Sequence, residues 1–197
     1  MQYETLDNQI KQAVLILEKN IELMNILDFI HKLNLPNFYI AAGSVFQTIW
    51  NYYDNKPLND KIKDIDIIYY NKEDLSVETD MKYYNLINDY CIKQGYNYEI
   101  DVSNEARMHL WKKEKFNIDV EQYLNSEDAI NKWIATVHAI GITKDNNNIK
   151  IYAPYGLSDI YSRTIRPIKH KYNTKEIYDK KAKSWSERFS NLNIIEW

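Results

Sequence analysis

The feature that most constrains the fold is an apolar segment that carries two carboxylates, Asp64-Ile65-Asp66-Ile67-Ile68-Tyr69-Tyr70. β-Branched and aromatic residues dominate it, so we predict a strand over residues 65–70, entered from Asp64. Because side chains alternate along a strand, the spacing of two places Asp64 and Asp66 on one face. Ile65 and Ile67 then point into the core. The two carboxylates repel each other unless a positive group lies between them.

A second pattern precedes this strand. Residues 38–42 are apolar and predict a short strand, Gly43 follows at once, and residues 44–53 predict a helix with Ser44 at its N-terminus. A glycine lets the backbone approach a ligand closely, and the first turn of a helix offers free N–H groups to an anion. The Ser44 hydroxyl adds a donor. Gly43 and Ser44 are therefore candidate phosphate-binding residues. Gln47 lies about one turn later and is a third candidate, although a surface role is equally consistent with its position.

The remaining periodicity predicts an α+β fold, in which a small mixed β-sheet is flanked by helices. Pro36 and Asn37 close the N-terminal helical region, and Ser126 is the expected cap of a later short helix. The predicted helices span residues 4–19, 21–33, 73–93 (with a start near Glu73 or Ser76), the segment from Ser103 or Asn104 to Lys113, 126–133, 156–161 and 174–189. The other predicted strands are residues 96–102 and the hairpin strands 135–143 and 149–153, joined through residues 144–148.

A third carboxylate is expected near the Asp64 and Asp66 pair. Asp101 lies on the predicted strand 96–102, although Glu99 is a rival on the same face. A hard divalent cation such as Mg²⁺ prefers oxygen ligands, so the three aspartates are candidate metal ligands. Arg107, on the helix that follows, is a candidate phosphate-binding residue, with a surface ion pair as the alternative.

Charge is distributed unevenly along the 197 residues, which carry a net charge of −3. Residues 163–189 hold nine Lys or Arg and three acids, a net charge of +6 on an otherwise acidic chain. This basic segment either meets a polyanionic substrate or pairs with the acidic body, and the second interpretation is favoured. We expect one domain over residues 1–197, with a core at about 36–160 and a basic helical tail at about 163–197.

Few features indicate a membrane or an oxidising compartment. The single cysteine, Cys91, excludes a disulfide within the chain and is interpreted as a small core residue. No apolar run reaches the roughly 18 residues that a membrane span requires, and residues 1–12 are polar. A cytoplasmic location is therefore expected. The four histidines are too scattered to predict a zinc site.

The order strand, Gly43-Ser44, helix, loop, Asp64-Ile65-Asp66 resembles the nucleotidyltransferase superfamily that includes polymerase β and the antibiotic nucleotidyltransferases. More narrowly, the chain resembles small, largely uncharacterised bacterial nucleotidyltransferase-like proteins over about residues 38–170. The segments that carry this resemblance are Ala41-Ala42-Gly43-Ser44-Val45, Trp50-Asn51, Asp64-Ile65-Asp66-Ile67, residues 104–111, residues 153–159 and Arg166-Pro167. That family usually has Gln in place of Glu105 and a basic residue in place of Phe46.

The resemblance implies a polymerase β-like core and a metal-dependent reaction. Asp64, Asp66 and Asp101 would bind Mg²⁺ or Mn²⁺, and Gly43 and Ser44 would hold the β- and γ-phosphates of a nucleoside triphosphate. The nucleoside monophosphate would pass to a small molecule, a protein side chain or an RNA end, and pyrophosphate would leave. The alternatives are a nucleotide-binding module without activity and a nucleic-acid-binding module that uses the basic segment. The oligomeric state is not predicted.

Overall fold

The computed structural model describes residues 1–146 and 148–197, so Asn147 of the predicted hairpin loop lies outside the described residues. A five-stranded mixed sheet in the order β3-β2-β1-β4-β5 forms the centre of the fold. Strand β2 pairs in parallel with β3, and the other neighbours are antiparallel. The strands are β1 (Tyr39–Ala41), β2 (Asp64–Tyr69), β3 (Glu99–Asn104), β4 (Gly141–Asp145) and β5 (Asn148–Tyr152).

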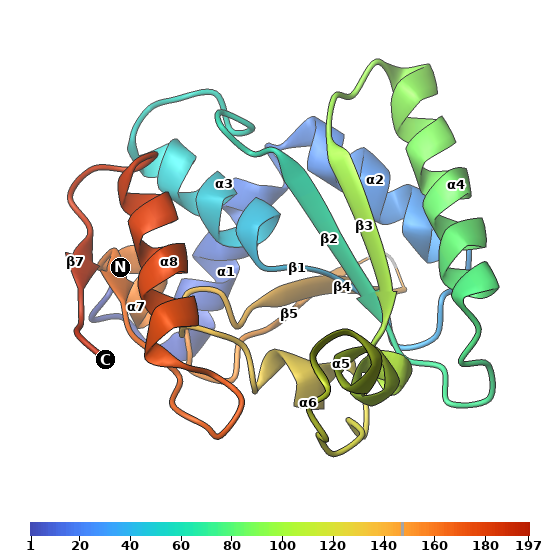
Figure 1. The fold of residues 1–197 in the computed structure, drawn as a ribbon. Coiled ribbons are helices and arrows are strands. Elements are labelled where there is room, and N and C mark those ends of the chain that lie inside the picture. Colours follow the sequence, from blue (N-terminus) through green and yellow to red (C-terminus); the bar gives the residue numbers. More distant parts are fainter. Residues whose placement is uncertain (147) are drawn as a thin grey trace.

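Helices surround this sheet, as Figure 1 shows. Helix α2 lies behind β2 and β3 in that view, α4 lies to the right of β3, and α5 and α6 lie near the lower end of β3. The helices are α1 (Leu6–Leu17), α2 (Ile21–Lys32), α3 (Gly43–Tyr53), α4 (Val77–Gln94), the 3₁₀ turn η1 (Glu105–Arg107), α5 (Met108–Phe116), α6 (Ser126–Ile130), α7 (Ser158–Tyr161) and α8 (Lys175–Ser186). Two short strands, β6 (Thr164–Ile165) and β7 (Asn193–Ile194), form a separate parallel pair. No helix in the described ranges 1–146 and 148–197 is long and apolar enough to cross a membrane.

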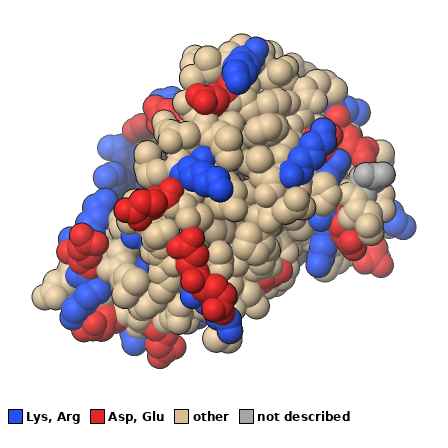
Figure 2. Space-filling view, turned by 90° about the vertical axis from the view of Figure 1, so that its right-hand side faces the viewer, with Lys and Arg blue, Asp and Glu red and all other residues tan. Residues whose placement is uncertain are grey.

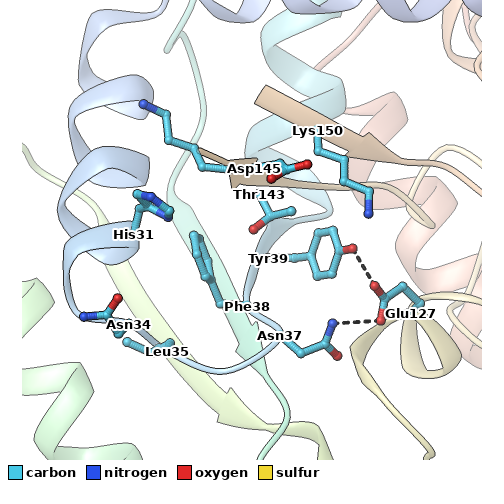
Figure 3. A pocket seen from close by; sticks show the side chains of 11 residues that line it. His31, Asn34, Leu35, Asn37, Phe38, Tyr39, Glu127, Thr143, Asp145 and Lys150 are labelled. Atoms are coloured by element: carbon cyan, nitrogen blue, oxygen red, sulfur yellow. Dashed lines mark hydrogen bonds between the residues drawn. The ribbon is translucent and has the colours of Figure 1, made fainter. Parts of the chain in front are cut away.

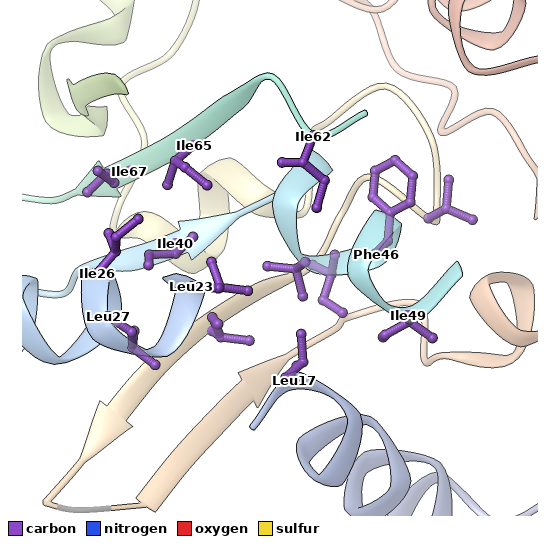
Figure 4. Packing of buried hydrophobic residues seen from close by; sticks show 14 of the residues in the cluster. Leu17, Leu23, Ile26, Leu27, Ile40, Phe46, Ile49, Ile62, Ile65 and Ile67 are labelled. Atoms are coloured by element: carbon purple, nitrogen blue, oxygen red, sulfur yellow. The ribbon is translucent and has the colours of Figure 1, made fainter. Parts of the chain in front are cut away.

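One face of the sheet is covered by α1 to α4 and holds the main core. Ile65 and Ile67 of β2 and Ile40 of β1 point into this core and are almost completely buried. Figure 4 shows these side chains against Leu23, Ile26 and Leu27 of α2. The side chains of β2 therefore alternate as predicted, with Ile65 and Ile67 facing the core and Asp64 and Asp66 on the opposite face.

The opposite face is only partly covered. Toward the end of β2, Ile68 packs with Tyr39 and Ala41 of β1 in a second, smaller apolar cluster, which also includes Ile130, Ala139 and Ile168. Ala41 pairs with Asp66, and Tyr39 pairs with Ile68, so the cluster and the aspartates share a face. The cluster closes one end of this face and leaves the aspartate end available for a ligand.

Helix α8 is held against α3 by aromatic side chains. Trp185 is 2% exposed and meets the ring of Phe46 edge-on, at 5.6 Å between ring centroids. Phe189 meets Trp50 in a similar way at 5.1 Å. Phe46 thus serves as the apolar contact for α8. The basic C-terminal segment is consequently fixed beside the start of α3.

Most predicted elements appear within a few residues of their expected bounds, and the differences have local causes. Helix α4 begins at Val77 with Ser76 as its N-cap, which agrees with the later of its two predicted starts; Glu73 is excluded because Asp74 accepts hydrogen bonds from Ser76 and Thr79 in a turn. It ends at Gly95, in the left-handed conformation, so β3 starts at Glu99 instead of residue 96. Asn125, not Ser126, caps α6 and accepts from the Asp128 backbone N–H.

The predicted strand 135–143 is wrong in its first half. Residues 135–140 form turns, in which the Ala139 backbone N–H donates to the carbonyl of Ala135 at 3.0 Å. Strand β4 begins only at Gly141. Apolar residues alone indicated a strand here, but Ala135 and Val137 are buried by neighbouring loops, and local hydrogen bonds satisfy the backbone.

Candidate active site

Three carboxylates meet on the open face of the sheet. Asp64 and Asp66 project from β2, and Asp101 lies beside Asp66 because the parallel register pairs these two residues directly. Glu99 pairs with Asp64 and shares the same face. Asp64, Asp66 and Asp101 line one cavity of about 510 Å³, which we call the acidic cavity. Its other walls come from η1, α5, α8 and the 133–138 loop.

The electrostatics of the acidic cavity centre on Asp66. Burial, together with the neighbouring Asp64 and Asp101, raises the pKa of Asp66 to about 7. Lys181 of α8 also lines the cavity and acts in the opposite direction, lowering this pKa. A half-buried cluster of like charges that a single lysine only partly neutralises is a favourable place for a cation.

The start of α3 lies beside this cluster. A methyl group at Gly43 would lie 2.9 Å from the Gln47 side-chain nitrogen and 3.8 Å from a carboxylate oxygen of Asp64. Gly43 therefore borders the aspartates, and a side chain there would enter the site. No side chain caps α3. Its N-terminus is thus suited to an anion next to the carboxylates.

Backbone strain in this turn falls on Ala42 rather than on Gly43. Ala42 has φ 56° and ψ −121°, a conformation that costs an alanine about 1–3 kcal/mol. Its N–H donates to the carbonyl of Ile140, and its carbonyl accepts from Val45 and Phe46. These bonds hold the strained turn that directs α3 toward Asp64.

Replacing Ala42 with glycine should raise stability by about 1 kcal/mol, because relief of strain exceeds the added entropy of the unfolded chain. The expected rise in melting temperature is about 2–4 °C. Thermal denaturation followed by circular dichroism measures it. Ala41→Gly, in the extended strand next door, is the control and should lose stability. Equal losses in both variants would show that Ala42 is not strained.

Ser44 and Gln47 are both buried, and each forms a hydrogen bond within the protein. The Ser44 side chain is fully buried, and its hydroxyl donates to the carbonyl of Ala41 at 3.4 Å. Gln47 is also buried and accepts a hydrogen bond from Arg188 at 3.2 Å. Burial lowers the pKa of Arg188, and nearby Asp64 partly offsets that effect. Arg188 thus adds a cation at the Gly43 end of the site.

Arg107 lines the acidic cavity but is already engaged. Its guanidinium forms an ion pair with Asp80 at 3.4 Å and also donates to the carbonyl of Leu75. Asp80 in turn accepts from Tyr69 and from the backbone of Asn104. This network fixes the end of β3 to the start of α4. Arg107 therefore supports the cavity wall in this structure.

The candidate metal ligands lie on one face of the sheet, an arrangement typical of a magnesium ion that also binds a substrate. In the described part of the chain, no group of three or more His, Cys, Asp or Glu side chains is placed so that it could hold a metal ion by itself. Mg²⁺ is usually held by one or two carboxylates together with phosphate oxygens and water. Asp64 and Asp66 are two such carboxylates, and burial together with the neighbouring Asp64 and Asp101 raises the pKa of Asp66. Two adjacent oxygen donors of this kind are compatible with Mg²⁺.

A second surface cavity, of about 410 Å³, lies around β1, β4 and α2, and Figure 3 shows its lining. Its carboxylate, Glu127, already accepts hydrogen bonds from Tyr39 at 2.6 Å and Asn37 at 2.9 Å. Lys144, another lining residue, is paired with Asp28. The polar groups of this cavity are largely satisfied within the protein, so the acidic cavity is the stronger candidate.

Two cations of the site were not singled out from the sequence. Lys181 and Arg188 appeared only as members of the basic segment 163–189. Their spacing of seven residues at the end of a helix was the available signal, because it brings two residues to one helix face. Which of the basic residues face the aspartates depends on the packing of Trp185 and Phe189 against α3.

Comparisons with known proteins are consistent with this geometry. A family model described as "Nucleotidyltransferase" matches residues 28–194, a range that includes α8. No curated protein matches the chain. A solved structure, described as a protein whose NMR structure reveals a CCA-adding enzyme head domain, matches with a TM-score of 0.78 and 26% sequence identity. The match covers 95% of this chain and 96% of that one.

Proposed function

The chain belongs to the nucleotidyltransferase family whose model it matches, and on this premise we propose that it transfers a nucleoside monophosphate from a nucleoside triphosphate to an acceptor. Pyrophosphate is the second product. The observation that carries the proposal is the direct pairing of Asp66 with Asp101 next to Asp64, on a sheet face that also borders Gly43.

In this proposal the triphosphate occupies the Gly43 end of the site. The free N-terminus of α3 and the guanidinium of Arg188 provide positive charge for the β- and γ-phosphates. Arg188 would exchange its bond with Gln47 for a phosphate oxygen, and Lys181 would balance charge nearer to the α-phosphate. Ser44 is buried, so its backbone, rather than its hydroxyl, is the part suited to this role.

Asp64 and Asp66 would hold Mg²⁺, or Mn²⁺, and Asp101 would serve as a further ligand on the acceptor side. The metal, when bound, neutralises phosphate charge and stabilises the attacking and leaving oxygens. The protein contributes chiefly position, since the three carboxylates are fixed by the β2–β3 register. The turn at Ala42 fixes the phosphate end in the same way.

Calorimetric titration of each of the four nucleoside triphosphates with Mg²⁺ tests the proposal. We expect at least one to bind, and we expect binding to weaken at least roughly tenfold, about 1.4 kcal/mol, in Asp64→Asn. Pyrophosphate release in the presence of candidate acceptors then tests for chemistry. Tight binding without any pyrophosphate release would instead indicate a nucleotide-binding module, and binding unchanged in Asp64→Asn would exclude the site.

Lys181 offers a selective test of the phosphate contacts. Because Lys181 is exposed and forms no ion pair in the described residues, Lys181→Ala should fold normally. We expect its KM for the nucleoside triphosphate to rise about tenfold with a smaller change in kcat. Lys183→Ala, which changes another exposed lysine of the same helix that points away from Lys181, is the matched control and should behave as the wild type. Equal KM values in the two variants would remove Lys181 from the site.

Surface charge gives less support to nucleic-acid binding. Figure 2 shows Lys and Arg interspersed with Asp and Glu, without a continuous basic patch, on the face that lies to the right in Figure 1, whereas α8 lies on the left in Figure 1. Within the basic segment, Lys175 is paired with Asp179, and Arg166 with Asp159. Arg163 is likewise paired with Asp54. Part of the basic charge is therefore balanced inside the protein, and Lys181 and Arg188 face the acidic site.

A further inference from the structure

A third cavity, distinct from the one in Figure 3, opens directly beside the acidic cavity. It has a volume of about 450 Å³, within the range of sites for small molecules. We call it the aromatic cavity, because Trp111, Tyr123, Trp133 and Tyr172 contribute to its walls. The two cavities share the residues Glu105, Met108, Trp111, Trp133, Ile134 and His138. A molecule bound in one would therefore touch the other.

Glu105 stands at the border between the two cavities and has no protein partner. It is only 6% exposed, and its carboxyl group takes part in no hydrogen bond or ion pair among the described residues. Burial raises the pKa of Glu105 to about 8, although Lys112 acts against this rise. Glu105 lines both cavities, so its carboxyl group is free to form a hydrogen bond with a ligand there.

The shape and lining of the aromatic cavity indicate what that ligand presents. Its walls are mainly aromatic and aliphatic, which suits a flat ring rather than a flexible polar chain. His138 contributes an imidazole whose pKa is lowered to about 3 by burial and by Lys181, so it is neutral at physiological pH. At the rim, Lys112 contacts the Tyr123 hydroxyl at 3.2 Å, and Lys132 lies over the Tyr123 ring at 5.2 Å.

The position of the aromatic cavity relative to the strands indicates which substrate enters it. Gly43 borders Asp64 at the start of β2, whereas Glu105 follows Asn104 at the far end of the parallel strand β3. The phosphate end and the aromatic cavity thus lie toward opposite ends of the β2–β3 pair. In an in-line displacement the attacking oxygen approaches from the side opposite the leaving pyrophosphate.

We propose that the aromatic cavity binds a planar, largely apolar ring of the acceptor, oriented by a hydrogen bond to the Glu105 carboxyl group. The acceptor hydroxyl or amine then lies on the Asp101 side of the α-phosphate. Its oxygen or nitrogen forms a bond to the α-phosphorus as the bond to the pyrophosphate oxygen breaks, and its proton leaves to solvent or a nearby base. The assignment to the acceptor rests on the proposed nucleotidyl transfer, but the existence of a ring site does not.

The test uses adenine, nicotinamide and indole as planar probes and cyclohexanol as a non-planar control. Binding is measured by ligand-observed NMR, first without nucleotide and then with saturating nucleoside triphosphate and Mg²⁺. We expect at least one planar probe to bind under both conditions and cyclohexanol to bind under neither. We expect Tyr172→Ala, which changes a residue that lines the aromatic cavity and not the acidic cavity, to weaken that binding at least tenfold while nucleotide affinity stays within threefold of the wild type. Trp197→Ala, far along the chain from the cavity lining, is the control.

Glu105→Leu separates the hydrogen bond from the ring contacts. Because Glu105 has no partner to lose, this variant should fold at least as well as the wild type. We expect it to lose adenine or nicotinamide binding, and we expect Glu105→Gln, which keeps an acceptor and a donor, to retain it.

Failure of every planar probe to bind would overturn the ring site. Displacement of the probes by the nucleoside triphosphate would overturn the acceptor assignment and give the cavity to the nucleobase. If no nucleotide binds at all, the proposed function fails, while the nucleotide-free measurement still decides whether the ring site exists.

Discussion

Asp66→Asn should abolish nucleotidyl transfer and at the same time stabilise the metal-free protein. Loss of a central metal-ligand candidate is expected to lower the rate of pyrophosphate release by roughly 10³-fold, about 4 kcal/mol. The same change removes a negative charge that burial and the flanking Asp64 and Asp101 make unfavourable. A variant that gains stability while losing activity shows that the residue is retained for function.

The size of the stability gain in Asp66→Asn depends on pH. The pKa of Asp66 is raised from 3.8 to about 7 in the folded protein. Folding therefore takes up a proton at pH values between these two pKa values. Wild-type stability therefore falls as pH rises from about 4 to about 7, and the full cost remains above that range. We expect Asp66→Asn to be more stable at pH 8, by on the order of 2 kcal/mol after allowing for solvent screening, and equal to the wild type near pH 4.

Urea denaturation at both pH values, with chelator present, measures this effect. Asp89→Asn is the matched control, since Asp89 is exposed on α4 and far from the cluster in the sequence. The control should show neither the loss of activity nor the gain in stability. An Asp66→Asn protein with activity within tenfold of the wild type would remove Asp66 from the metal site.

Trp185→Ala should have the largest effect on stability, because it removes the ring that joins α8 to Phe46 of α3. Replacement of a buried aromatic residue by alanine costs about 3–5 kcal/mol. Lys181 and Arg188 lie on either side of Trp185 in the sequence, so release of the helix would also remove two cations from the site. We therefore expect weaker nucleotide binding even at temperatures where the rest of the protein is folded.

Trp197→Ala is the matched control for this variant. Trp197 lies near Tyr178 at 6.0 Å between ring centroids and does not contact the acidic cavity. We expect a smaller loss of stability and unchanged nucleotide affinity. Denaturation curves and calorimetric titration measure the two effects separately. Unchanged nucleotide affinity in folded Trp185→Ala would show that α8 has no part in the donor site.

The central part of the fold could be predicted from sequence because its signals are local. The alternation in residues 64–69 set both the strand and the face of the carboxylates, and the parallel register then placed Asp101 beside Asp66. The turn at Gly43 was predicted as well, but its strained residue is Ala42, since φ depends on the path of the neighbouring strands. The family comparison supports the fold and the general activity; the roles of individual residues remain predictions.

The parts that could not be predicted depend on contacts between distant segments. Residues 135–140 are apolar enough for a strand, yet they form turns because their burial comes from other loops. Gln47 is equally consistent with a surface or a buried position until Arg188 is placed beside it, 141 positions along the chain. Glu105 carries no sequence signal of isolation, because the lack of a partner is a property of its folded surroundings.

The three-residue strand β1 also has a consequence for how the molecule assembles. Ala41 pairs with Asp66 on one side and with Gly141 on the other, so its two neighbours lie at very different distances along the chain. Segments close in sequence meet quickly, whereas pairings across long loops form slowly. We expect β1, α3, β2, α4 and β3 to associate first and to bring all three aspartates together. Strand β4 and the cations of α8 then join late. The folding pathway therefore includes an intermediate in which the three aspartates are together but no cation is yet beside them. A divalent ion present during refolding should therefore accelerate the early phase more than the late one.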